Sequence, residues 1–198
     1  VEKKMKVCIV AEGCYPYVVG GVSGWINSLI QSFPNIEFIL LTIIANRSSR
    51  GKFVYELPKN VTQVYEVYLE DCEWNNGKKR QKNRKHIRLS KKEYTEMLNM
   101  VLNRKTDWNI LFDLFQRKNL SIDDLLMGPD FFQIARECYN RKYSGIVFSD
   151  FLWTLRSIYL PMFWVLKMNI PKADLYHCVA TGYAGVLGSM AVHFHDSS

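Results

Sequence analysis

Short apolar runs and a helical pattern alternate at the start of the chain. Residues 6–11 and 36–45 are near-continuous runs of aliphatic side chains, typical of strands buried in a parallel sheet. Between them, apolar residues recur at helical spacing before Pro34: Val22, Trp25, Ile26, Leu29, Ile30 and Phe33. A strand, a helix and a second strand within about 40 residues predict a right-handed crossover in a doubly wound sheet.

The middle of the chain has a different pattern. Residues 61–69 alternate between apolar and polar side chains and predict a third strand. From about residue 90 to residue 145 the pattern is helical, and it opens with an S-x-x-E capping box at Ser90 and Glu93. This stretch predicts a helical insertion between strands of the sheet.

The last part of the chain returns to the first pattern. Asp150 is predicted to cap a helix of aromatic and aliphatic residues, and residues 174–179 predict a fourth strand. A helix of small residues is then expected from Tyr183 to Val192. We therefore expect an α/β protein, one Rossmann-like doubly wound parallel sheet over residues 1–198 with a helical insertion at about 90–145.

The positive charge of the chain is concentrated in one segment. The 198 residues carry a net charge of +7, and residues 78–92 hold nine of the 26 bases and no acid. The remaining 17 bases face 19 acids, a net charge of −2. The segment is either a solvated loop or a contact for a phosphate-bearing or anionic-membrane partner.

Cysteine usage and hydropathy indicate the compartment. The five cysteines form no C-x-x-C pair, which favours a reducing compartment without disulfides or a zinc site. The longest apolar run, Ile158 to Leu166, has nine residues, against about 20 for a membrane-spanning helix. A cytoplasmic protein is expected, and the first and last residues suggest a chain cut from a longer one.

A glycine-rich loop follows the first predicted strand. Gly20 and Gly21 would let the backbone approach a ligand, and the helix that follows presents unpaired N–H groups to an anion. The alternative is a turn without a ligand. Val19 stands where the first glycine of a dinucleotide fingerprint would fall, so NAD binding is disfavoured.

A second candidate loop follows the fourth predicted strand. His177 precedes Thr181 and Gly182 at the carboxyl end of this strand, and it is either a structural residue or part of a ligand crevice. Arg156 lies in an apolar helical stretch. It either pairs with Asp150, Glu12 or a ligand phosphate, or its charged end reaches solvent.

Two blocks of sequence carry a family resemblance. The stretch Glu12 to Trp25 matches E-G-x-Y-P-Y-x-x-G-G-V-S-x-W, and Ala173 to Gly185 matches A-D-x-Y-H-x-x-x-T-G-Y-A-G. These blocks resemble the opening half of family 4 glycosyltransferases, and more closely the PelF-type group that acts in Pel exopolysaccharide synthesis. Both ends of the chain are covered, and the first block is the more specific.

The resemblance implies the N-terminal half of a GT-B architecture. Such enzymes are retaining, metal-independent transferases that use a nucleotide-sugar donor, which is UDP-glucose in this group, and no further cofactor. It implies a glycan acceptor, a membrane-bound polysaccharide export complex as partner, and a place at the inner face of the membrane. The donor diphosphate would be bound by Gly20, Gly21 and Val22. The acceptor cleft would be lined by Glu12, Tyr15, Tyr17, Arg156, His177, Thr181, Gly182 and Tyr183.

The chain also departs from the family pattern. Many family members carry a second histidine where this chain has Val179, and the group's E-H-G-x-Y segment and donor domain would follow Ser198. We therefore expect no sugar transfer by this polypeptide alone. The alternative function is a non-catalytic α/β binding module that uses residues 78–92. Nucleic acid is disfavoured as the partner, since His86 and arginine are the only stacking side chains there.

Overall fold

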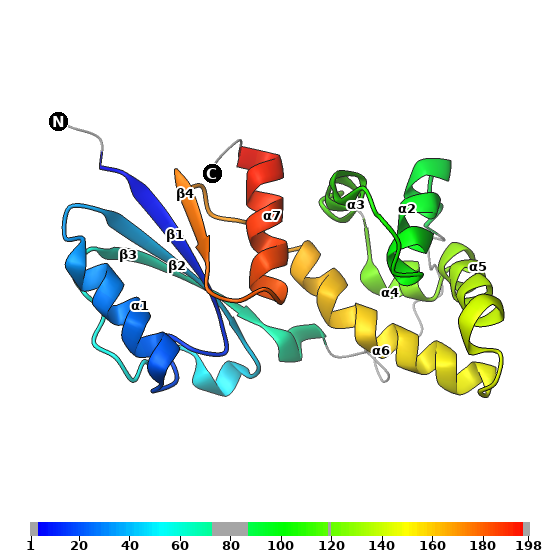
Figure 1. Cartoon of the computed structure of the whole chain (residues 1–198), viewed down its shortest axis with the longest axis horizontal. Helices are drawn as coiled ribbons and strands as arrows, with labels where there is room; N and C mark the ends of the chain where they lie inside the picture. The colour runs from blue at the N-terminus through cyan, green and yellow to red at the C-terminus, as the bar shows by residue number, and fades with distance from the viewer. Residues whose placement is uncertain (1–3, 73–86, 119, 196–198) are drawn as a thin grey trace. The chain divides into compact units, whose positions relative to one another are not determined.

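A computed structural model of the chain describes residues 4–72, 87–118 and 120–195. Two compact units make up the chain, residues 1–72 with 168–198 and residues 73–167. The first contains a four-stranded sheet in the order β3-β2-β1-β4, and all three pairings are parallel (Figure 1). The strands are β1 (Lys6–Glu12), β2 (Glu37–Ile44), β3 (Val61–Tyr68) and β4 (Leu175–Cys178).

Strands β1 and β2 form the buried centre of the sheet. Residues 7–11 of β1 and 38–44 of β2 are all buried, as their nearly continuous apolar sequence predicts, and Thr42 is the one polar residue among them. In the register, Ile9 pairs with Leu40 on one side and with His177 of β4 on the other. The sequence prediction of a Rossmann-like parallel α/β fold with a helical insertion is confirmed.

The two helices of the sheet unit cover opposite faces of the sheet. Helix α1 (Gly21–Ser32) packs Ile26 and Ile30 into a cluster with Ile9. Helix α7 (Tyr183–His195) lies against Cys178, which pairs with Val10 and therefore faces the other side. Alternation of side chains along β1 thus assigns one helix to each face.

The residues between β3 and β4 form a helical unit with its own core. Phe115, Phe131 and Phe163 are fully buried, with ring centroids 4.6 and 6.2 Å apart. The unit therefore has an apolar centre independent of the sheet. Its helices are α2 (Lys91–Val101), α3 (Trp108–Phe115), α4 (Ile122–Leu126), α5 (Pro129–Cys138) and α6 (Phe148–Leu166), with a π-helical turn at Tyr139–Tyr143.

The sequence predicted which residues cap the N-termini of two of these helices, α2 and α6. The capping box of Ser90 and Glu93 is present at the start of α2. The expectation that Asp150 caps the following helix is wrong, because α6 begins at Phe148 with Val147 as its cap residue. The helix thus begins three residues earlier than expected, and its first residue, Phe148, packs edge-on against the ring of Tyr139 with centroids 5.1 Å apart.

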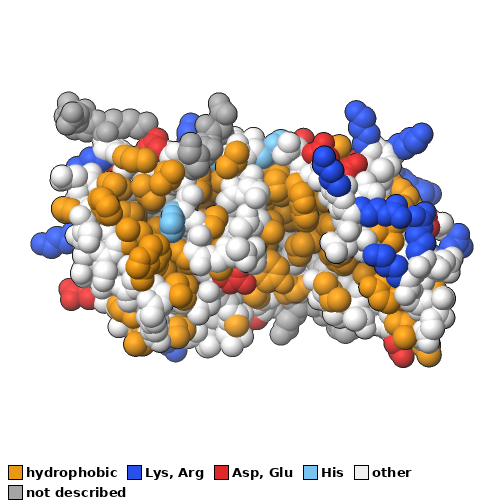
Figure 2. All heavy atoms as spheres, viewed as in Figure 1, with side chains coloured by type: hydrophobic (Ala, Val, Ile, Leu, Met, Phe, Trp, Pro, Cys, Tyr) orange, Lys and Arg blue, Asp and Glu red, His pale blue; other side chains and the backbone are white. Residues whose placement is uncertain are grey.

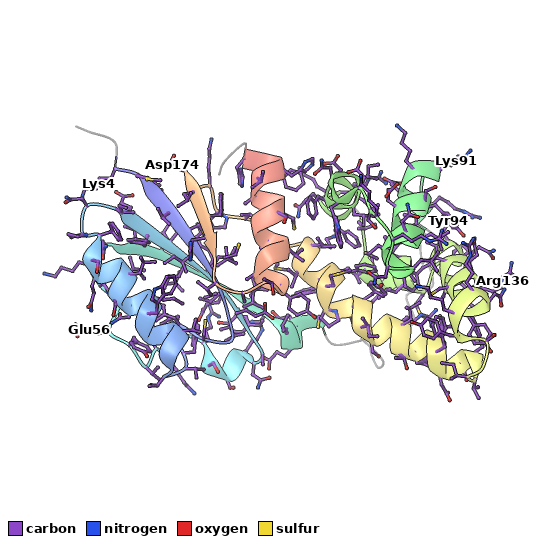
Figure 3. All side chains as sticks on the ribbon, viewed as in Figure 1. Lys4, Glu56, Lys91, Tyr94, Arg136 and Asp174 are labelled. Carbon is purple, nitrogen blue, oxygen red and sulfur yellow. The ribbon has the colours of Figure 1, made fainter. Side chains whose placement is uncertain are left out.

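Side-chain hydrogen bonds also join the helices of this unit. Tyr94 of α2, labelled in Figure 3, donates from its hydroxyl to Glu137 Oε1 of α5 at 2.8 Å. Burial, together with the Glu137 carboxylate, raises the pKa of Tyr94 to about 12. The phenol therefore stays protonated and keeps donating at neutral pH.

The closest approach between α7 and the sheet yields a stability prediction. A Cβ added to Gly188 would lie 2.3 Å from Cys178 Sγ, and Sγ contacts the Ala184 carbonyl oxygen at 3.2 Å. We expect Gly188→Ala to lower the free energy of unfolding by about 1–3 kcal/mol, because Sγ must leave that contact. Urea denaturation of the purified chain measures it.

Gly185→Ala is the matched control in the same helix. A Cβ at Gly185 comes no closer than 3.7 Å to the Ala180 carbonyl oxygen, so this change should be neutral or stabilising by up to about 1 kcal/mol. In the double variant, Cys178→Ala removes the sulfur atom that the new Cβ meets, so it should restore most of the stability that Gly188→Ala loses. If Gly188→Ala and Gly185→Ala changed the free energy of unfolding equally, the close contact between Gly188 and Cys178 would be contradicted.

Candidate functional site

The loops that follow the four strands lie at one edge of the sheet. Because every pairing is parallel, all carboxyl ends point the same way, and this is where ligands of open α/β sheets bind. Two of these loops lead into helices, residues 13–20 before α1 and 179–182 before α7. The two helix N-termini at this edge are the candidate anion sites.

The N-terminus of α1 is open. Gly20 and Gly21 are exposed, and a Cβ built on either meets no atom within 4 Å. No side chain caps this helix, and its first turn has no acidic residue. The first N–H groups of a helix have no intrahelical acceptor, so Gly21, Val22 and Ser23 start a helix end that can receive an anion.

The N-terminus of α7 is occupied by the protein itself. Glu12 Oε2 accepts a hydrogen bond from the Ala184 N–H at 3.2 Å. A Cβ on Gly182 would lie 2.8 Å from the same oxygen, so glycine leaves room for the carboxylate. Thr181 and Gly182 are exposed beside it. Burial and the nearby Glu12 raise the pKa of Tyr183, which keeps its hydroxyl protonated.

The two tyrosines of the first loop have different environments. Tyr15 is fully buried in the core under α1, and its hydroxyl donates to Asn27 Oδ1 at 3.2 Å. Burial, with the neighbouring Tyr55, raises its pKa to about 12. The half-buried Tyr17 packs edge-on against Phe53 at 5.4 Å. Tyr15 therefore anchors the loop from inside the core, while Tyr17 lies nearer its surface.

Glu66 of β3 was not predicted as a site residue. Its carboxylate accepts from the Tyr17 hydroxyl and, at 3.1 Å, from the Gly51 N–H. Burial raises the pKa of Glu66, but the hydrogen bonds from Tyr17 and Gly51 and the nearby positive charge of Arg50 outweigh it, and the net pKa lies below the usual value. In the sequence, Glu66 is only an acidic residue near the end of a predicted strand in which apolar and polar side chains alternate.

His177 lies on the α1 face of the sheet. It pairs with Ile9, which contacts α1, and its ring centroid is 5.6 Å from that of Trp25. The two rings are tilted by 40°. The second sequence block therefore meets the first at this pair, and Trp25, which ends the first block, was not among the predicted site residues.

Arg156 belongs to the helical unit, whereas the other predicted site residues belong to the sheet unit. It is buried, and its Nε donates to the Leu126 carbonyl oxygen at 3.0 Å. Its guanidinium also lies 5.5 Å from the ring centroid of Trp153. Burial lowers its pKa. The structure thus gives it a partner at the carboxyl end of α4 instead of Asp150 or Glu12.

Most of the basic segment lies outside the described residues, which resume at residue 87. Within the described part, Arg88 forms an ion pair with Asp130 at 3.1 Å. Lys91 and Lys92 begin α2 and line a shallow hollow with Thr95. The alternative function of a binding module depends on residues 78–86 and is not tested by this geometry.

The described part of the chain contains neither a metal-binding cluster nor a membrane-spanning helix. Its histidine, cysteine and acidic side chains form no group of three that could hold a metal ion. None of its helices combines the length and the hydropathy needed to cross a bilayer.

The fold and this edge define the class of protein. A parallel sheet with a glycine loop before an open helix N-terminus is a Rossmann-like α/β domain. Residues 5–198 match a family described as Domain of unknown function (DUF3492), and the chain belongs to that family. This domain is commonly found in glycosyltransferase-like proteins. No curated protein and no solved structure matches the chain significantly.

The contacts of Glu66 predict a pH dependence of stability. A carboxyl whose pKa is lowered on folding stabilises the protein above its unfolded pKa, which is about 4.3, and this is lost as the pH falls through the folded value. Glu66→Gln should therefore cost most stability near neutral pH and progressively less below about pH 4. Urea denaturation across a pH series measures the difference from the wild type.

Glu56→Gln is the control, since Glu56 is an exposed carboxylate of the same unit (Figure 3). A destabilisation by Glu66→Gln that stays constant between pH 3 and pH 7, like that of a neutral residue, would contradict the assignment.

The contact between Glu12 and Gly182 predicts coupled effects. Gly182→Ala should displace the carboxylate from α7 and lower the free energy of unfolding by about 1 kcal/mol. In a Glu12→Ala background the same change should cost much less, because the clash is gone. Additive effects of the two changes in a thermodynamic cycle would show that the side chains do not interact.

Proposed function

We propose that this chain is the N-terminal, acceptor-side domain of a retaining glycosyltransferase of GT-B architecture. It would act with a second domain to move a hexosyl group from a nucleotide sugar, UDP-glucose, to a polysaccharide acceptor. The observation that carries the proposal is the open N-terminus of α1 behind the exposed Gly20 and Gly21. The family's occurrence in glycosyltransferase-like proteins supports the same class.

The chemistry of the transfer matches this helix end. The bond between the anomeric carbon and the diphosphate oxygen breaks, the acceptor hydroxyl forms the new glycosidic bond and passes its proton to the departing diphosphate, and UDP leaves. Negative charge on the diphosphate grows as the bond breaks. Unpaired N–H groups and the positive end of a helix dipole stabilise that charge more in the transition state than in the bound donor.

The contacts at the N-terminus of α7 favour the N-terminus of α1 as the position of the anion. At the neighbouring α7, Glu12 already places a negative charge against the helix N-terminus. A diphosphate there would meet a carboxylate and lose the hydrogen bond to the Ala184 N–H. Of the two helix ends, α1 is therefore the site for the leaving group, and Glu12 has a structural role in shaping the loop of Thr181 and Gly182.

The loop before α1 is held from two sides. Tyr15 anchors it in the core, and Tyr17 donates to Glu66, which also binds the Gly51 N–H. These contacts fix the loop before a ligand arrives, so little ordering remains for the donor to impose. The proposal includes a glycan acceptor and a membrane-bound polysaccharide export complex as partners, and no metal.

A bulky side chain at Gly21 tests the donor site. Nothing lies within 4 Å of a Cβ there, so Gly21→Leu should fold with an unchanged melting temperature. The side chain would cover the helix N-terminus, and we expect UDP-glucose affinity and sugar transfer by the intact natural protein to fall at least about 100-fold. Calorimetric titration with UDP-glucose and product analysis measure the two effects.

Gly145→Leu is the matched control, since Gly145 is also exposed with open space around its Cβ but lies in the helical unit. It should retain donor affinity and transfer. Unchanged UDP-glucose binding by the Gly21 variant, or no binding by the wild type, would overturn the proposed function.

A further inference from the structure

Helix α1 exposes apolar side chains beside the proposed donor site. Its pattern of apolar residues predicts a buried face, yet Val22 is 52% and Trp25 is 49% exposed. Val18 and Val19 of the preceding loop are also exposed. Figure 2 shows apolar side chains gathered around a histidine over the α1 and β4 side of the sheet. A contiguous apolar patch of this kind marks a contact surface more often than scattered exposed residues do.

The Trp25 ring is held in place. His177 of β4 lies against it, with ring centroids 5.6 Å apart and a tilt of 40°. His177 is itself half-buried and belongs to β4, where it pairs with Ile9 of the buried strand β1. The indole is thus restrained on one side by a second ring while half of its surface stays open.

The position of Trp25 relative to Gly21 is set by the helix. The two residues are four apart in α1, so they lie on the same side, about 6 Å along the axis. Ser28, exposed three residues further, adds a hydroxyl on that side. A ring stacked on Trp25 would therefore lie within one hexose unit of an anion bound at Gly20 and Gly21.

The charge of this surface restricts the kind of ligand. Helix α1 contains no charged residue from Gly21 to Ser32. A nucleic-acid or lipid headgroup surface would need cations beside the aromatic ring. A pyranose ring needs none, since its C–H face packs on the negative face of an aromatic ring and its hydroxyls bond to neighbouring polar groups.

We propose that Trp25, restrained by His177, is a stacking platform for a neutral hexopyranose ring one helical turn from the diphosphate site. This inference rests on the proposed function and assigns a residue outside the sites expected from the sequence. The pyranose is either the hexose of the donor or a unit of the glycan acceptor, because both meet at the reacting bond.

The test follows the Trp25 indole by NMR in the intact natural protein, selectively labelled with ¹⁵N-tryptophan. The resonance missing from Trp25→Phe identifies the residue. UDP, UDP-glucose and cellotetraose are titrated separately. A shift with cellotetraose assigns the acceptor unit, and a shift with UDP-glucose that UDP alone does not produce assigns the donor hexose. No shift of this resonance by either sugar overturns the platform.

Affinity supplies the second measurement. Trp25→Ala should weaken binding of the sugar that shifts the indole by about tenfold, and Trp25→Phe should weaken it less because a ring remains. Trp153→Ala is the matched control, a tryptophan 50% exposed in the helical unit, and should leave affinity unchanged. A lower melting temperature with unchanged sugar affinity in Trp25→Ala would show that the indole only packs, which overturns the proposal.

The failures of the two proposals are distinguishable. Binding of UDP that is lost in Gly21→Leu supports the donor site whatever the Trp25 resonance does. A Trp25 shift with cellotetraose in a protein that binds no UDP would support a sugar-binding surface and overturn the transferase.

Discussion

The parallel pairing of β1 with both β2 and β4 is the constraint on which the rest of the sheet unit depends. The register Ile9 with Leu40 and with His177 places β1 between β2 and β4 and sends these three strands in one direction. Consequently the loops after β1 and β4, residues 13–20 and 179–182, lie at the same edge although they are far apart in the chain. The juxtapositions of Glu12 with the start of α7 and of Trp25 with His177 both follow from that pairing.

The edge is made selective by one internal carboxylate. Two helices begin there, and each N-terminus is a potential anion site by the same physics. Glu12 occupies the end of α7, and Gly182 provides the space that this requires. The end of α1 has neither a side-chain cap nor an acidic residue in its first turn. The difference between the two ends comes from a single side chain, and under the proposed function it leaves the end of α1 as the site for the diphosphate.

The helical unit is inserted into the chain without entering the sheet. Its aromatic core around Phe115, Phe131 and Phe163 buries its own apolar surface, so the order of strands is the same as in a sheet without an insertion. Arg156 is an example of a polar contact made within this unit, since its Nε donates a hydrogen bond to the Leu126 carbonyl oxygen of the same unit. A buried cation in an apolar helix thus has a structural partner, and its burial alone is no sign of a ligand.

The sequence by itself determined the class of fold. Runs such as residues 6–11 and 36–45 are almost entirely apolar because strands of a parallel sheet are covered on both faces, and that requirement is local enough to be seen in the pattern. The glycine pair and the capping box of Ser90 and Glu93 were visible for the same reason, since backbone geometry and the first turn of a helix involve neighbouring residues.

Only the tertiary structure decided which of the candidate residues meet. Tyr15 and Tyr17 are two positions apart, yet one is buried and the other donates to Glu66, because strand β3 brings that carboxylate to the loop. Trp25 fits the helical pattern of a core residue but stays half exposed, and the ring beside it is His177 of β4. Contacts between distant segments depend on strand order and register, and periodicity along the chain carries no record of either.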